Sequence, residues 1–169
     1  QEEKSFGAGD LAATLGYEIL PDWDYNPWRP KGLAFLQLTA PTGRSVYEAD
    51  APYQLDARGR GFWALGLGTL LTKAWGRWDS FVNLETHRSF AKTYSNQASR
   101  GELRPGWGGN LSTGAGYNTE SMRFGISLSW AYEDPIEVRG TASSQGSSER
   151  YATASLSGSY MFSDEWAGT

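Results

Sequence analysis

Two neighbouring segments, residues 107–117 and 122–132, alternate strictly between large or apolar residues and small or polar ones. A period of two is the pattern of a β-strand whose two faces differ chemically. The four residues between the segments have turn chemistry. The pattern therefore predicts a β-hairpin with one apolar face and one small, polar face, in which Tyr117 pairs with Met122.

Each of these segments is long for a strand of a soluble protein. Ten steps of about 3.3 Å make roughly 33 Å, which is about 25 Å of height at a tilt near 40°. That height matches the apolar band of a transmembrane β-barrel, whereas ordinary strands have about six residues. The alternative is a long hairpin in a soluble β-sandwich, with its apolar face on a core. Aromatic residues end the apolar rows, as interfacial girdles do: Trp107, Tyr117, Trp130 and Tyr132.

The same alternation predicts five further strands and the beginning of another. The expected strands are residues 10–20, 31–40, 62–74, 79–90 and 150–162, and an eighth begins at residues 166–169. From residue 41 onward, long polar loops alternate with short turns, as the extracellular loops and periplasmic turns of outer-membrane barrels do. The long loops are residues 41–61, 91–106 and 133–149.

The expected fold is therefore all-β: an antiparallel transmembrane β-barrel of seven strands plus the start of an eighth. Residues 1–169 form one barrel domain. Eight strands is the lower limit for such barrels, so we expect an incomplete portion of a larger barrel, truncated at both ends. The strand at residues 10–20 should then not pair with the strand at residues 150–162.

Strand parity assigns each side chain to one of two faces. The residues expected to face lipid are Trp63, Leu65, Leu67, Val82, Leu84, Leu111, Phe124, Ile126, Leu128 and Leu156. The residues expected to line a pore are Glu18, Asn83, Glu85, His87, Asn110, Ser112, Arg123, Ser127, Ser129, Ser155 and Ser157. The expected girdle residues are Trp75, Trp78, Trp107, Tyr117, Trp130, Tyr132 and Tyr160, with Trp75 paired to Trp78 across a tight turn.

Composition excludes several classes of function. The chain of 169 residues has a net charge of −4, which predicts no nucleic-acid partner. It has no Cys and a single His, so disulfides, thiolate metal sites and multi-histidine sites are excluded, and we expect no metal and no cofactor. No run of eighteen apolar residues is present, which argues against a transmembrane helix.

One constellation has the residue types of a hydrolase. His87 and Ser89 lie two residues apart on one face of an expected strand, as a nucleophile and its base could. An outer-membrane phospholipase has a similar arrangement, but there the pair faces lipid, whereas parity turns His87 and Ser89 inward. No Asn or Asp partner is evident, so we expect an ordinary inward-facing histidine and no catalytic residue.

Short glycine-rich motifs give the chain a family resemblance. They are Gly9-Asp10-Leu11 leading to Tyr17-Glu18-Ile19-Leu20-Pro21, then Ala40-Pro41-Thr42-Gly43, and Gly61-Phe62-Trp63-Ala64-Leu65-Gly66-Leu67-Gly68 leading through Lys73 to Trp75-Gly76-Arg77-Trp78. With these motifs the chain resembles the meta-pathway phenol-degradation transporters, channel-like proteins of the bacterial outer membrane. The resemblance implies passage of small, often aromatic compounds.

The expected function is a passive channel or uptake barrel for small molecules in the outer membrane of a Gram-negative bacterium. Its partners would be outer-membrane lipid and small solutes, and other envelope proteins or copies of itself are further candidates. Two alternatives stay open: a structural barrel that anchors or plugs a larger envelope assembly, and an outer-membrane hydrolase. The inward polar wall has no ring of like charge and favours neutral or weakly charged solutes.

Overall fold

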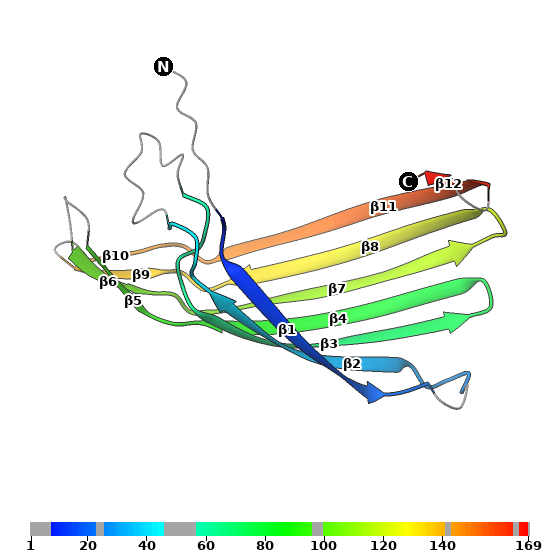
Figure 1. The fold of residues 1–169 in the computed structure, drawn as a ribbon, viewed down its shortest axis with the longest axis horizontal. Coiled ribbons are helices and arrows are strands. Elements are labelled where there is room, and N and C mark those ends of the chain that lie inside the picture. The colour runs from blue at the N-terminus through cyan, green and yellow to red at the C-terminus, as the bar shows by residue number, and fades with distance from the viewer. Residues whose placement is uncertain are drawn as a thin grey trace, which may run out of the picture.

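A computed structural model describes residues 8–22, 26–45, 57–95, 100–140, 143–163 and 166–168. Eight strands form one antiparallel sheet in the order β1-β2-β3-β4-β7-β8-β11-β12 (Figure 1). These strands are β1 (Leu11–Leu20), β2 (Lys31–Ala40), β3 (Ala64–Trp75), β4 (Trp78–Ser89), β7 (Trp107–Asn118), β8 (Met122–Glu133), β11 (Glu149–Ser163) and β12 (Trp166–Gly168). The prediction of seven long antiparallel strands and a short eighth is confirmed, with boundaries shifted by two residues at most.

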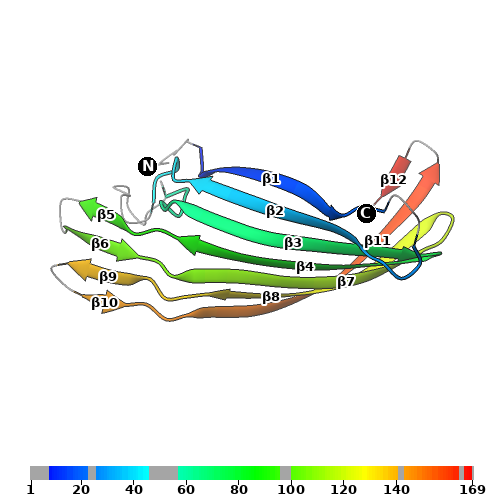
Figure 2. The same ribbon diagram turned by 90° about the horizontal axis from the view of Figure 1, so that it is seen from below.

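A second sheet occupies two of the expected long loops. Its order is β10-β9-β6-β5, built from β5 (Lys92–Ser95), β6 (Arg100–Arg104), β9 (Glu137–Gly140) and β10 (Ser144–Gln145). The prediction that residues 91–106 and 133–149 are only loops is wrong, because the connections fold into short hairpins that pair with each other through β6 and β9. Figure 2 shows this small sheet beyond one end of the large one.

The large sheet is long, twisted and curved (Figures 1 and 2). Its ends differ: the turn end has two tight connections, and the loop end bears the small sheet. We call the face that carries Asn83 and Ser112 the inner face, and the face that carries Leu84 and Leu111 the outer face. Directly paired residues share a face in an antiparallel ladder, so the registers assign every strand residue to one of the two.

The turns set these registers. Trp75 pairs with Trp78 as predicted, and Gly76 between them has a φ of 57°, in the left-handed region that favours glycine. The predicted pairing of Tyr117 with Met122 is wrong, since Tyr117 pairs with Phe124. Thr119 and Met122 close a tighter turn, in which the Met122 N–H donates to Thr119 Oγ1 (2.9 Å). The shift of two residues leaves every side chain on its expected face.

The sheet is open. β1 and β12 are its edge strands, and no pairing joins β1 to β11 within the described ranges, as expected. β12 pairs with β11 only from Tyr160 to Ser163, so most of that side of β11 has no neighbouring strand among the described residues. Closure into a barrel is therefore not present in this sheet.

Very little of the apolar surface forms a core. Among the described residues, the buried hydrophobic side chains are Phe62, Leu103 and Ala131, all near the loop end. The outer face is instead exposed, with Leu84 at 53 % and Leu128 at 54 % of their full accessible surface. No helix that is long and apolar enough to cross a membrane occurs in the described ranges.

Candidate functional site

The inner face brings together every residue that parity predicted to line a pore. One row across the sheet pairs Asn83 with Ser112 and Ser112 with Ser129, and the neighbouring rows follow the same parity. The complete predicted set shares this face: Glu18, Asn83, Glu85, His87, Asn110, Ser112, Arg123, Ser127, Ser129, Ser155 and Ser157. The result is a polar wall that runs along seven strands.

Glycines on the inner face make room for large side chains of adjacent strands. A Cβ added at Gly114 would lie 2.5 Å from Cε1 of Phe81, and one added at Gly68 would collide with the ring of Phe35. Both rings therefore lie over the backbone of the neighbouring strand. The two aromatic residues interrupt the polar wall near its middle.

An ionic cluster lies on the inner face near the loop end. His87 of β4 places Nε2 3.0 Å from Glu133 Oε1 of β8 and Nδ1 3.5 Å from Glu85 Oε1. The contact with Glu133 crosses the whole of β7, and it is possible because the intervening residue is Gly108. Arg60, from the segment before β3, donates from Nη1 to Glu133 Oε1 (3.2 Å). We call Arg60, Glu85, His87 and Glu133 the mouth cluster.

The mouth cluster borders a recess of about 570 Å³ on the inner face. Its lining combines hydrogen-bonding side chains, such as Gln37 and Asn110, with the rings of Phe62 and Tyr151. Such a lining suits a small molecule with both apolar and hydrogen-bonding groups.

Asp10 fixes one wall of this recess. Its carboxylate accepts hydrogen bonds from the backbone N–H groups of Gly43 (3.0 Å), Arg60 (2.7 Å) and Gly61 (3.4 Å). These bonds tie residues 41–45 and 57–61 to the start of β1. Gly61 has a φ of 76°, and a Cβ added to it would collide with the side chain of Ser45. Part of the expected long loop at residues 41–61 is thus anchored beside the recess, while residues 46–56 lie outside the described ranges.

Two further ion pairs lie on the inner face toward the turn end. Arg123 Nη2 lies 2.8 Å from Asp79 Oδ1, across Gly116 of β7, and Asn118 donates to Asp79 Oδ2 (2.6 Å). Glu18 of β1 pairs with Lys31 of β2 at 3.1 Å. Charges of both signs therefore sit at each end of the polar wall, and the stretch between them is uncharged.

His87 and Ser89 do not form the nucleophile–base pair that their spacing would allow. Both ring nitrogens of His87 face carboxylates, and Ser89, which is buried, forms no side-chain hydrogen bond with His87 among the described residues. Within those residues, no three His, Asp or Glu side chains are arranged to hold a metal ion.

The outer face carries all the residues that were predicted to face lipid and form girdles. The apolar set is Trp63, Leu65, Leu67, Val82, Leu84, Leu111, Phe124, Ile126, Leu128 and Leu156, and all are exposed. Among the aromatic residues, Trp107, Trp130 and Tyr132 lie toward the loop end, and Trp75, Trp78, Tyr117 and Tyr160 toward the turn end. The rings of Trp78 and Tyr117 pack at 4.9 Å between centroids.

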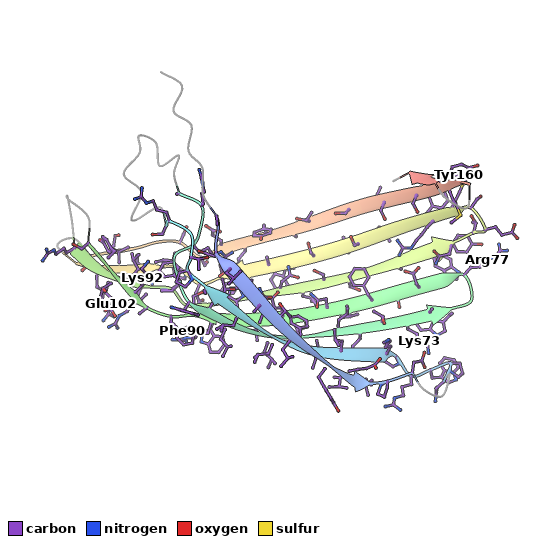
Figure 3. All side chains as sticks on the ribbon, in the orientation of Figure 1. Lys73, Arg77, Phe90, Lys92, Glu102 and Tyr160 are labelled. Atoms are coloured by element: carbon purple, nitrogen blue, oxygen red, sulfur yellow. The ribbon has the colours of Figure 1, made fainter. Side chains whose placement is uncertain are left out.

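One outer-face cation is hydrogen-bonded to backbone carbonyls. Lys73, buried near the turn end, donates from Nζ to the carbonyls of Asn26 and Arg29 (2.8 Å for Arg29). Trp75 donates from Nε1 to the carbonyl of Pro27 (3.0 Å), so residues 26–29 lie against this end of β3. Figure 3 shows Lys73, Arg77 and Tyr160 at the turn end and Phe90, Lys92 and Glu102 at the other.

Several residues of the inner site were missed by sequence reasoning. Glu133 continues the inward parity of β8, and ending that strand at Tyr132 concealed it. Arg60 and Asp10 contact the site from segments without a regular pattern, so no periodic signal could place them.

The small sheet adds a recess of about 840 Å³ between its base and Arg60.

No protein-family model and no curated protein matches the sequence. The resemblance to the phenol-degradation transporters thus stays a proposal.

Proposed function

We propose that this chain forms part of the wall of an outer-membrane β-barrel in a Gram-negative bacterium, through which small neutral or weakly charged molecules diffuse. The observation that carries the proposal is the contrast between the two faces of the large sheet. One is apolar along its length and bounded by aromatic residues; the other is lined by Ser, Asn and Gly.

The outer face supports a lipid environment. Soluble monomers rarely expose apolar patches larger than a few hundred Å². Here exposed apolar side chains extend over β1 to β11, and no second sheet packs on them within the described chain. Strands of twelve residues, with aromatic rings toward both ends, have the length and boundary that a bilayer requires.

The inner face supports an aqueous passage. Between the mouth cluster and the Asp79–Arg123 pair, its polar side chains are hydroxyls and amides, which solvate a solute without fixed charge. The Arg60–Glu133 and Arg123–Asp79 pairs join charges of opposite sign on this face, and the stretch of wall between them carries no ring of like charge to repel cations or anions. Small aromatic compounds, which the family resemblance suggests, suit a recess lined by Phe62, Tyr151, Gln37 and Asn110.

Closure of the barrel requires further strands. An unpaired strand edge in lipid leaves N–H and C=O groups unsatisfied, at a cost of several kcal/mol each. The free edges of β1 and β11 are therefore covered by strands from further sequence or from other copies of the chain. A soluble β-sandwich, in which the outer face packs on another sheet, is the competing account of the same pattern.

Liposome swelling with the full-length protein tests the proposed passage. We expect small sugars, which a lipid bilayer excludes, to enter vesicles that contain the protein and not protein-free vesicles. Ser129→Trp, on the inner face, should slow entry because the indole narrows the lumen. Leu128→Trp, one residue away on the outer face, should leave the rate unchanged. No entry of any solute, combined with tight binding to another envelope protein, would favour the scaffold function instead.

A further inference from the structure

Two guanidinium groups lie on the outer face near the loop end, each against an aromatic ring. Arg88 of β4 places Cζ 5.2 Å from the ring centroid of Trp107, and Arg150 of β11 lies 5.3 Å from that of Tyr132. Both arginines have outward parity and are exposed. We call these four residues the arginine belt.

Neither arginine of the belt forms an ion pair with any described residue. By contrast, Arg60, Arg123 and Arg139 pair with carboxylates at 2.8–3.2 Å. Asp134, whose charge attracts Arg88, accepts hydrogen bonds from the Tyr132 hydroxyl (2.6 Å) and from the Trp107 backbone N–H (2.9 Å). The Arg150 guanidinium also lies within reach of the Tyr132 hydroxyl. Among the described residues, no other acceptor contacts either guanidinium group.

The register places the two halves of the belt two residues apart along the sheet. Arg88 pairs with Trp107, whereas Tyr132, which pairs with Arg150, lies opposite Gly109 in the row of Thr86. Three strand spacings of about 4.8 Å separate β4 from β11 by roughly 14 Å, and the offset of two residues adds roughly 7 Å along the strands. Directly toward the turn end lies the apolar band, so the belt stands where that band meets the polar loop end.

Among the described strands of the large sheet, one other basic residue faces outward, and it has acceptors within the protein. Lys73, near the turn end, is held by the carbonyls of Asn26 and Arg29 and is buried. On the described strands of the large sheet, the outward-facing basic groups without an ion pair therefore lie near the loop end, and Arg77 is a basic residue of the β3–β4 turn at the other end.

We propose that the arginine belt binds the phosphate groups of anionic lipids in the leaflet at the loop end. This inference rests on the proposed membrane location. A guanidinium fork matches two phosphate oxygens, and the ring beneath it holds the fork in place, which lowers the entropy lost on binding. Trp and Tyr are the aromatic residues that favour the headgroup level, with an apolar body and a polar edge.

The test is the relative association of spin-labelled phosphatidylglycerol and spin-labelled phosphatidylcholine with the full-length protein in phosphatidylcholine vesicles. Electron paramagnetic resonance separates lipids that are slowed by contact with protein from bulk lipids. Each basic residue near a headgroup contributes a factor of about five. The wild type should prefer the anionic lipid, and Arg88→Gln/Arg150→Gln should lower that preference by about five-fold at each of the two arginine sites.

Matched variants separate charge from structure. Arg139→Gln, in the small sheet, should keep the wild-type preference, and Arg88→Lys/Arg150→Lys should keep part of it. If the wild type and the double glutamine variant slow phosphatidylcholine equally and also prefer the anionic lipid equally, the arginine belt does not bind anionic lipid. Absence of any slowed lipid for the wild type would overturn the proposed membrane location as well. Loss of the preference in phosphate buffer, but not in chloride at the same ionic strength, would assign the site to free phosphate.

Discussion

The two faces of the β7–β8 hairpin share one backbone and meet opposite requirements. On the outer face, Leu111, Ile126 and Leu128 are exposed, and the sequence requirement is uniform apolarity. On the inner face, polar side chains are tolerated, but space is limited where a neighbouring ring lies over a glycine, as Phe81 does over Gly114. The outer face should thus tolerate changes of shape and reject charge, and the inner face should tolerate polarity and reject bulk at its glycines.

The largest expected effect is a charge on the outer face. Leu128→Arg should lower the free energy of unfolding from vesicles by about 2–4 kcal/mol, because the guanidinium enters the middle of the apolar band. Ser127→Arg, one residue away, should cost far less because its side chain faces the polar wall. Urea titrations in vesicles measure both changes. Similar losses at the two positions would contradict the assignment of the faces.

Bulk at an inner glycine should have the next largest effect. Gly114→Ala should cost about 1–3 kcal/mol, since the new Cβ meets Phe81 Cε1 at 2.5 Å and the carbonyl of Ile126 at 2.8 Å. The control is Gly158→Ala on the outer face of β11, where no atom lies within 4 Å of the added Cβ. The same unfolding titration should find the control neutral or slightly stabilising, and a reversed order would refute the space argument.

An inner ion pair should contribute less. Arg123 and Asp79 retain 46 % and 30 % of their side-chain exposure, so water screens their attraction. A double-mutant cycle with Arg123→Gln and Asp79→Asn should give a coupling of about 0.2–1 kcal/mol that falls as salt is added. A coupling well above this range, insensitive to salt, would show that the inner wall excludes water.

The smallest effect should come from Asp134, which joins the ends of β7 and β8. Hydrogen bonds from the Tyr132 hydroxyl and the Trp107 N–H hold the pKa of this carboxyl below its ordinary value of 3.8. A lowered folded-state pKa stabilises the fold above pH 3.8, and this contribution is lost as the pH falls through the folded value. Wild type should therefore exceed Asp134→Asn in stability at neutral pH, and the two should converge in acid. If the stability difference between wild type and Asp134→Asn stayed constant from neutral pH into acid, ionisation of Asp134 would not contribute to stability.

Period-two alternation predicted the seven long strands and the face of each side chain, because those properties depend only on local sequence and on a sheet with two different environments. The β7–β8 register was missed by two residues, since the hydrogen bonds of Thr119 with Met122 decide the turn and alternation does not. The small sheet was missed because its central pairing, Leu103 with Val138, joins segments far apart in sequence.

The residues of the candidate site also fall into two groups, those that alternation predicts and those that it cannot predict. Asn83, Glu85, His87 and Ser112 follow from parity alone. The contact of His87 with Glu133 required knowledge that Gly108 separates them, and Arg60 lies on an irregular segment. The arginine belt could have been found from the sequence once the register was known, since Arg88 pairs with Trp107 and Arg150 with Tyr132.

The most direct test of the two-faced wall is a cysteine scan of residues 123–132 on β8. The chain contains no cysteine, so each variant carries a single spin label. In vesicles, we expect labels at Phe124, Ile126 and Leu128 to collide with oxygen, which concentrates in lipid, and labels at Ser127 and Ser129 to collide with a water-soluble nickel complex. Outer-face labels that are shielded from both reagents would indicate packing against another protein sheet and would contradict the membrane wall.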